Sequence, residues 1–221
     1  MLDTIQDVLE GNIKALEAIT DVEGKENLYI IPGSKDIDQT FRLRYSQKVL
    51  HDSLRVEELS AIDIVLIDCP STLNEAVETG LYASDYAVLV TETESLSIEN
   101  LKKTITAIEE VDSPKDLKVA GILVNKVDMR RNITKDNLKL LGDLYGKELL
   151  ESTISVDSSI VYSHNLKKPV RDMEYRPRSV SQFQKAAEEL LARMAEDEAK
   201  DNDKDCNAVS TTDTEVVAHG C

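Results

Sequence analysis

The stretch Ile64-Val65-Leu66-Ile67-Asp68-Cys69-Pro70-Ser71 decides the fold class of this chain. An apolar, mostly β-branched run ends in an acid, and a turn containing proline follows. A run that is apolar at every position is typical of a parallel strand covered by helices on both faces. Ligand sites in open α/β sheets lie outside the carboxyl ends of such strands. Asp68 is therefore a candidate for holding Mg²⁺-bound water beside a triphosphate; alternatively, it ends the strand and caps the next helix.

The rest of the chain repeats this alternation of strands and helices. Other short apolar runs predict strands at residues 28–31, 86–90 and 119–124, with a weaker one at 152–156. Apolar residues at helical spacing predict helices at residues 4–18, 71–83, 97–111 and 134–145, and one from Ser179 that opens with a Ser179–Gln182 capping box. The pattern predicts a doubly wound α/β fold over residues 1–194, a mostly parallel sheet flanked by helices. Residues 195–221 are too polar to form a core, and we expect a disordered tail there.

Composition excludes several classes of protein. The 221 residues are 41% hydrophobic and carry a net charge of −16. No apolar run approaches the ~20 residues of a membrane-spanning helix, and the first residues lack the basic and apolar regions of a secretory signal. The three cysteines, Cys69, Cys206 and Cys221, have neither disulfide nor metal-site spacing, so we expect a reducing cytoplasm.

A second motif, Asn125-Lys126-Val127-Asp128, follows the strand predicted at 119–124. In GTPases, Asn-Lys-x-Asp at this place reads guanine, because the carboxylate accepts hydrogen bonds from the ring N–H and the exocyclic amine. In related ATPases, the asparagine alone contacts the edge of adenine. A polar loop that leaves a strand is the third interpretation.

The third quarter of the chain is locally basic. Residues 126–178 hold 11 lysines and arginines against eight acids, whereas the flanking parts are acidic. DNA phosphates attract such clusters through counterion release, which makes Arg130, Arg131, Lys167 and Lys168 candidates for DNA contact. The alternative is ordinary solvated surface.

The order of these pieces is more specific than any one of them. The strand ending in Asp68-Cys69-Pro70 is followed by Gly121-Ile122-Leu123-Val124-Asn125-Lys126 and by Tyr175-Arg176-Pro177-Arg178-Ser179. Over residues 4–194 the chain resembles the ParA/Soj/MinD family of deviant-Walker P-loop ATPases, and it is more similar to the ParA/Soj branch. The resemblance implies a plasmid or chromosome partitioning protein that binds ATP and Mg²⁺, with Asp68 toward the metal and Asn125 toward adenine. It also implies nonspecific DNA and a ParB-like centromere-binding protein as partners, a homodimer in the full form, and no membrane.

The chain departs from the family at its start. Family members begin with a strand, a Lys-Gly-Gly-x-Gly-Lys-Thr-like loop and a helix, all before the position of Met1 here. We therefore expect an N-terminally incomplete domain that has no assigned catalytic residue and hydrolyses no ATP alone. The missing strand would lie beside residues 62–67, so we expect a gap there or a rearranged sheet. The alternatives are a degenerate, non-catalytic paralogue that acts as a protein-interaction module, and a GTPase-like remnant.

Overall fold

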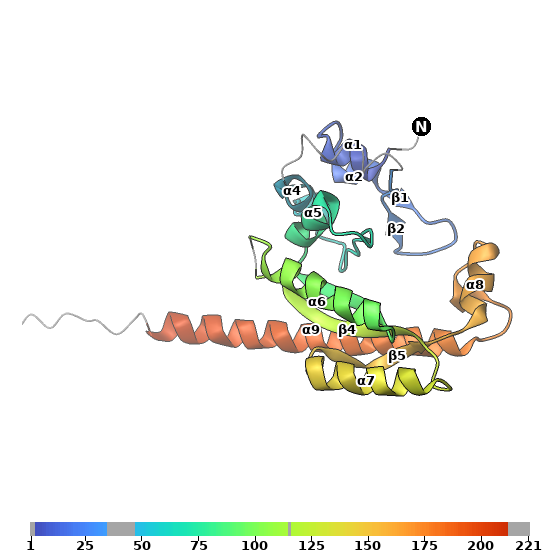
Figure 1. Ribbon diagram of the computed structural model, residues 1–221. Coiled ribbons are helices and arrows are strands. Elements are labelled where there is room, and N and C mark those ends of the chain that lie inside the picture. The colour runs from blue at the N-terminus through green and yellow to red at the C-terminus, as the bar shows by residue number, and fades with distance from the viewer. Residues whose placement is uncertain (1–2, 35–46, 115, 212–221) are drawn as a thin grey trace, which may run out of the picture. The chain divides into compact units, whose positions relative to one another are not determined.

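The computed structural model describes residues 3–34, 47–114 and 116–211 of the chain. The chain divides into two compact units (Figure 1). Unit 1 contains Met1–Ala87 and Lys102–Lys118, and unit 2 contains Val88–Leu101 and Val119–Cys221.

Unit 1 is built mainly from short helices. Its elements are α1 (Ile5–Leu9), α2 (Ala15–Ala18), β1 (Thr20–Asp21), β2 (Tyr29–Ile30), α4 (Lys48–Leu54), the 3₁₀ helix η1 (Glu57–Leu59) and α5 (Glu75–Ala83), together with most of α6 (Ser95–Glu109).

The single helix predicted over residues 4–18 is wrong, because the chain forms α1 and α2 instead. Gly11 has a φ of +72°, a left-handed conformation that glycine adopts without steric penalty. The N–H of Gly11 donates to the carbonyl of Val8 at 3.0 Å, and the N–H of Asn12 donates to that of Asp7 at 3.0 Å. This pair of bonds is a Schellman motif, and it ends α1.

The buried parallel strand predicted at residues 28–31 is also wrong. Tyr29 and Ile30 form β2, which pairs antiparallel with β1 in the register Thr20↔Ile30 and Asp21↔Tyr29. Both residues of β2 are exposed. A local hairpin therefore forms from a run whose composition is that of a buried strand.

Unit 1 has a core of two small clusters. One contains Val8, Ala15, Ala18 and Leu59, and the other contains Leu9, Leu50 and Ala83. Asn74 caps α5 by accepting hydrogen bonds from the N–H groups of Ala76 and Val77, both at 3.1 Å.

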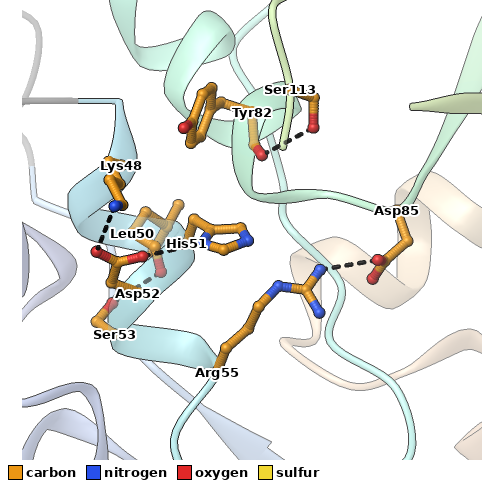
Figure 2. Close-up of polar contacts among 9 residues, drawn as sticks. All are labelled: Lys48, Leu50, His51, Asp52, Ser53, Arg55, Tyr82, Asp85 and Ser113. Atoms are coloured by element: carbon orange, nitrogen blue, oxygen red, sulfur yellow. Dashed lines mark hydrogen bonds and ion pairs between the residues drawn. The ribbon is translucent and has the colours of Figure 1, made fainter. Parts of the chain in front are cut away.

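Polar contacts join the end of α4 to the end of α5, and join α5 to residue 113 (Figure 2). Arg55 donates to Asp85 at 2.8 Å, and the Ser113 hydroxyl donates to the carbonyl of Tyr82 at 3.3 Å. The His51 and Tyr82 rings meet edge to face with centroids 5.9 Å apart. These contacts hold α4 and α5 together around a small core.

Residues 62–67 form no strand in the described part of the chain, so the strand predicted there is wrong. A strand exists only when a neighbour accepts and donates its backbone hydrogen bonds. The expected gap beside this segment stays a prediction.

Unit 2 contains the sheet. Its strands are β3 (Tyr86–Glu92), β4 (Lys118–Val127) and β5 (Leu149–Ser155), in the order β3-β4-β5. Strands β4 and β5 are parallel, with Ile122↔Leu149 and Val124↔Thr153 in register. The helices of this unit are the start of α6, α7 (Asn132–Tyr145), α8 (Ser158–Asn165), the 3₁₀ helix η2 (Val170–Asp172) and α9 (Arg178–Thr211).

The sheet and helices of unit 2 confirm the predicted α/β class. The side chains of Ile122, Val124, Leu141 and Ile154 are fully buried. Helices α7 and α9 both pack against β5, and α9 runs along that strand in Figure 1. Gly121 of β4 leaves room for the buried Leu150 side chain of β5, because a Cβ there would stand 2.6 Å from Cδ2 of Leu150.

Side chains of α9 cover the backbone of β5. Glu189 accepts hydrogen bonds from the N–H groups of Glu151 and Ser152 at 2.9 and 3.0 Å, and Gln182 accepts from that of Ser155 at 3.1 Å. Partial burial acts to raise the pKa of the Glu189 carboxyl, but these two N–H donors outweigh it and lower that pKa. The covered strand therefore offers few free donors to another chain.

The predicted Ser179–Gln182 capping box is wrong. The Ser179 hydroxyl is buried without a hydrogen-bond partner among the described residues. Asp157 instead accepts a hydrogen bond from the Ser179 N–H at 3.2 Å. The Gln182 amide donates to the Ser155 hydroxyl at 2.9 Å and so does not reach the start of α9.

Helix α9 continues through residues 195–211, where composition predicts a disordered tail. The boundary at residue 194 stays a prediction, and residues 212–221 lie outside the described residues. Among the described helices, none is both long and apolar enough to cross a membrane.

Candidate functional site

Asp68 stands in unit 1, directly after the unpaired segment, and it is exposed. No described residue hydrogen-bonds to its side chain. The neighbouring thiol of Cys69 lies close to Gly80, since its Sγ is 2.9 Å from where a Cβ on Gly80 would stand. Cys69 is exposed as a residue, but partial desolvation of its thiol raises the pKa, and the charge of Asp68 raises it further. A raised pKa disfavours the thiolate form that binds metals.

Asn125 lies near the carboxyl end of β4, as the sequence predicts. Its side-chain oxygen accepts from the N–H of Lys126 at 2.9 Å, and Lys126 has a φ of +53°. The Lys126 ammonium donates to Oε1 of Glu92, the last residue of β3, at 2.6 Å. That hydrogen bond and the carboxylate charge raise the pKa of Lys126. The ends of two neighbouring strands are thereby joined beside Asn125.

The Asp128 carboxylate forms a bidentate hydrogen-bonded contact with the Arg130 guanidinium. Nε of Arg130 donates to Oδ1 at 2.7 Å, and Nη2 donates to Oδ2 at 2.8 Å. This bidentate contact lowers the pKa of Asp128 to about 2. A carboxylate that reads guanine has to accept from the base with both oxygens, and here both oxygens already accept from a guanidinium.

A buried polar network behind this edge was missed by the sequence analysis. The Thr93 hydroxyl donates to that of Thr134 at 3.4 Å, and the Asn137 amide donates to the Thr93 carbonyl at 2.9 Å. All three residues are buried. The network fixes the start of α7 to the chain that follows β3. The sequence could have indicated this network, because Thr134 and Asn137 lie at helical spacing on the same face of α7 as the apolar Leu141.

The candidate DNA residues are exposed and lie in two places in unit 2. Arg130 and Arg131 precede α7, and Arg131 is its N-cap residue. Lys167 and Lys168 follow α8, where their N–H groups donate to the carbonyls of His164 and Ser163 at 3.0 and 3.1 Å.

These bonds form a Schellman motif with Lys167 at the left-handed position, φ +52°. A lysine at that position is strained, whereas glycine is the usual residue there.

The site residues therefore fall in both units. Asp68 belongs to unit 1, and Asn125, Arg130, Arg131, Lys167 and Lys168 belong to unit 2. The structure brings Asn125 next to the Lys126–Glu92 pair and engages Arg130 with Asp128, while the roles of the six residues stay predictions.

Comparison with known proteins decides the family. The family model described as AAA domain matches residues 2–121, more than half of the chain. The chain belongs to the ParA/Soj/MinD family of P-loop ATPases.

Relatives of the family agree over most of the chain. The chromosome-partitioning ATPase Soj of Treponema pallidum is 25% identical over 202 residues, which cover 86% of this chain and 77% of that protein. The cell division ATPase MinD of Pyrococcus furiosus has the same fold, with a TM-score of 0.68, 21% identity, and coverage of 86% of this chain and 75% of that one.

A further family neighbour was solved with nucleotide. Cobyrinic acid a,c-diamide synthase of Mycobacterium smegmatis, with a bound ATP analogue and magnesium, has a TM-score of 0.54 and 25% identity. The match covers 64% of this chain and 59% of the synthase, so this chain spans less than two thirds of that protein. A nucleotide and Mg²⁺ are thus found in the fold family.

The residues present do not make a complete site for that nucleotide. Mg²⁺ takes several oxygen ligands, and triphosphates are bound by a cradle of backbone N–H groups at a helix N-terminus. Within the described ranges there is no cluster of three or more His, Cys, Asp or Glu residues able to hold a metal ion. The sequence contains no Gly-x-x-x-x-Gly-Lys-Ser/Thr loop. The roles of Asp68 and Asn125 toward metal and adenine therefore stay predictions.

Proposed function

We propose that this chain is a ParA/Soj-like protein of plasmid or chromosome partitioning, which associates with DNA. The observation that carries the proposal is its similarity to the partitioning ATPase Soj over 86% of the chain. Overall acidity argues against binding DNA with the whole surface, so the contact belongs to the locally basic part of unit 2.

The pairs Arg130–Arg131 and Lys167–Lys168 are the DNA contacts in this proposal. All four side chains are exposed. Arg130 keeps one guanidinium nitrogen outside its bidentate contact with Asp128. The strain at Lys167 supports a role for its side chain, because an observed backbone outlier is a reason to look for function.

ATP and Mg²⁺ belong to the full form of the family in this proposal. There Asp68 would face the metal, and Asn125 would face adenine. We assign no hydrolysis step to the described residues, because they provide no phosphate cradle. A ParB-like centromere-binding protein and a homodimer are the further partners that family membership suggests.

One alternative function has an observation of its own. A non-catalytic paralogue that acts as a protein-interaction module is favoured by the exposed apolar residues Ile64, Val65 and Leu66. The GTPase-like alternative stays open, because Arg130 is exposed and each carboxylate oxygen of Asp128 can accept a second hydrogen bond.

DNA binding tests the proposal directly. Fluorescence anisotropy with a labelled duplex, repeated over a salt series, gives the affinity and its salt dependence. The variant Lys167→Ala + Lys168→Ala removes two phosphate contacts, so the slope of log affinity against log salt should fall by about 2. The variant Arg130→Ala + Arg131→Ala should act in the same direction.

The matched control is Lys102→Ala + Lys103→Ala, an adjacent exposed lysine pair with the same change in net charge. It should leave the slope unchanged. A parent chain that binds no duplex at low salt, or equal slopes for the Lys167 pair and the control pair, contradicts the proposal.

A further inference from the structure

The two most exposed aromatic side chains among the described residues belong to the same part of unit 2. Tyr162 of α8 is 53% exposed, and Tyr175, which precedes α9, is 51% exposed. The Tyr175 hydroxyl donates to Oγ of Ser159, in the first turn of α8, at 3.2 Å. Ser159 and Tyr162 are three residues apart and are therefore neighbours on the helix surface. The Tyr175 ring is thus tied to the helix that carries Tyr162.

This exposure needs an explanation, because the chain has few aromatic residues. It contains seven tyrosines, two phenylalanines and no tryptophan. An aromatic side chain supplies a large apolar area when it is buried, and two rings here leave about half of theirs in water. Leu166 is 45% exposed and follows Tyr162 by four residues, so it lies on the same side of α8. Tyr162, Leu166 and Tyr175 are here called the tyrosine platform.

Positive charge surrounds the tyrosine platform in the sequence. Residues 158–178 hold five lysines and arginines against two acids. All five cationic residues are exposed, and within the described ranges none of them forms a salt bridge with an acid. They are Lys167, Lys168, Arg171, Arg176 and Arg178. Arg178 donates to the carbonyl of Val156, a neutral acceptor that leaves its charge uncompensated. The segment therefore attracts polyanions, although the whole chain is acidic.

Exposed aromatic rings among cations are the combination that binds single-stranded nucleic acids, because bases stack on the rings and phosphates contact the cations. The base faces inside a duplex are covered by neighbouring base pairs, so the rings can add affinity only for unpaired bases. We propose that the tyrosine platform and its five cations bind single-stranded nucleic acid more tightly than duplex. This inference rests on the proposed association with DNA and adds the form of strand that the site prefers.

An acidic protein segment is the competing partner, since the same cations would attract it. Protein interfaces have a continuous apolar centre. Val161 is the most exposed aliphatic residue of α8, at 65%, but it is turned about 100° around the helix from Tyr162. The platform itself therefore offers two rings and a single aliphatic side chain, which favours stacked bases over an apolar helix.

Fluorescence anisotropy of the full chain with labelled oligothymidine of ~16 nucleotides tests the proposal beside a duplex of the same length. We expect tighter binding of the single strand. Tyr162→Ala and Tyr175→Ala should each weaken that binding at least about fivefold and leave duplex binding unchanged. Tyr162→Phe and Tyr175→Phe keep the rings and should keep the affinity.

The matched control is Tyr29→Ala, because Tyr29 is an exposed tyrosine of β2, in unit 1. It should bind oligothymidine as the parent does. Circular dichroism should show that the alanine variants fold as the parent does.

An abasic strand of the same length separates bases from phosphates. Tyr162→Ala should bind the abasic strand as the parent does, because no base is there to stack. Lys167→Ala + Lys168→Ala should weaken binding of both strands. With oligothymidine, this lysine variant should lower the slope of log affinity against log salt by about 1.4, whereas Tyr162→Ala should leave the slope unchanged.

Two further ligands identify the source of the anion. Oligouridine presents the same stacking and phosphate chemistry as RNA, so the tighter of oligouridine and oligothymidine names the nucleic acid, and either result supports the proposal. Polyglutamate carries charge without bases and should displace oligothymidine poorly. Displacement as effective as that by unlabelled oligothymidine would assign the surface to an acidic protein and overturn the proposal.

The outcomes separate this inference from the proposed function. Equal affinity of Tyr162→Ala and Tyr29→Ala for oligothymidine overturns the inference, and so does duplex binding that is as tight as single-strand binding. In both cases the retained duplex binding leaves the proposed function standing. Single-strand binding that depends on Tyr162, without any duplex binding, supports the inference and contradicts the proposed duplex contact.

Discussion

Asp157 joins three elements of unit 2, and its removal should destabilise that unit. The residue follows β5 and is the N-cap of α8, where Oδ1 accepts from the N–H of Ser159 at 2.9 Å. Oδ2 accepts from the N–H of Ser179, in the first turn of α9, at 3.2 Å. One carboxylate therefore satisfies donors at the start of two helices. Asp157→Ala leaves both donors without this partner.

The expected loss of stability in Asp157→Ala can be estimated from the pKa of Asp157 and from the typical cost of losing an N-cap. Partial burial acts to raise the pKa of Asp157, but the hydrogen bonds from Ser159 and Ser179 outweigh it and lower that pKa from 3.8 to about 2. A shift of nearly two units corresponds to at most ~2.5 kcal/mol. Because the carboxyl is partly open to solvent, screening reduces this to ~1 kcal/mol. Loss of an N-cap has a typical cost of about 0.5–2 kcal/mol, so we expect Asp157→Ala to lower the free energy of unfolding by about 1–2 kcal/mol.

The pH dependence distinguishes charge from capping. A carboxyl with a lowered pKa in the folded state stabilises the protein above its unfolded pKa of 3.8, and this contribution is lost as pH falls toward about 2. Asp157→Asn keeps an acceptor oxygen but not the charge. It should be less stable than the parent at neutral pH and equal to it near pH 2.

Urea unfolding followed by circular dichroism measures both effects. Asp136→Ala is the control, because Asp136 is an exposed acid of α7. The reasoning is refuted if Asp157→Ala loses no more stability than Asp136→Ala. It is also refuted if the Asp157→Asn deficit persists undiminished near pH 2.

Two further substitutions test the packing and the strain. Gly121→Ala should lower the free energy of unfolding by about 1–3 kcal/mol, because its Cβ would stand 2.6 Å from Leu150. Gly142→Ala, whose Cβ would meet nothing within 4 Å, should raise the free energy of unfolding by up to ~1 kcal/mol through helix propensity. Thermal melts measure both effects. Equal effects of the two would contradict the packing. Lys167→Gly should raise the free energy of unfolding by up to ~1 kcal/mol while weakening duplex binding, because it relieves a φ of +52° and removes a charge. The control is Lys168→Gly, which should weaken duplex binding without raising the free energy of unfolding. A stability gain in Lys168→Gly alone would contradict strain at Lys167.

Sequence reasoning succeeded for the apolar runs that became strands of the three-stranded sheet. The apolar runs at 86–90 and 119–124 were predicted as strands, and they became β3 and β4, longer by a few residues. It failed at 28–31 and 62–67, although these runs have the same composition. Hydrophobic pattern reports that a segment is suited to burial, but a ladder needs a neighbouring backbone that the pattern does not supply.

The candidate site was predictable in position rather than in contacts. Asn125 was placed at the end of a strand and is found there. The bidentate contact of Arg130 with Asp128 and the cap of α9 by Asp157 were not foreseen. Which donor meets a carboxylate depends on loop geometry, and sequence spacing alone favoured the Ser179 capping box, whose hydroxyl is left without a partner.

The segment at residues 62–67 leads directly into the first candidate site residue. Asp68 follows Ile67 directly, and no described residue hydrogen-bonds to its side chain. Metal ligands work only when they are held within about 0.5 Å of the required position. Packing anchors Ile67 on one side through the Leu9, Leu50 and Ala83 cluster, but the backbone before it makes no ladder bonds. A strand added along residues 63–67 would fix this backbone and the direction of the Asp68 carboxylate with it. If Asp68 is a metal ligand, as the sequence predicts, we expect it to bind only where the backbone before it is paired with another strand.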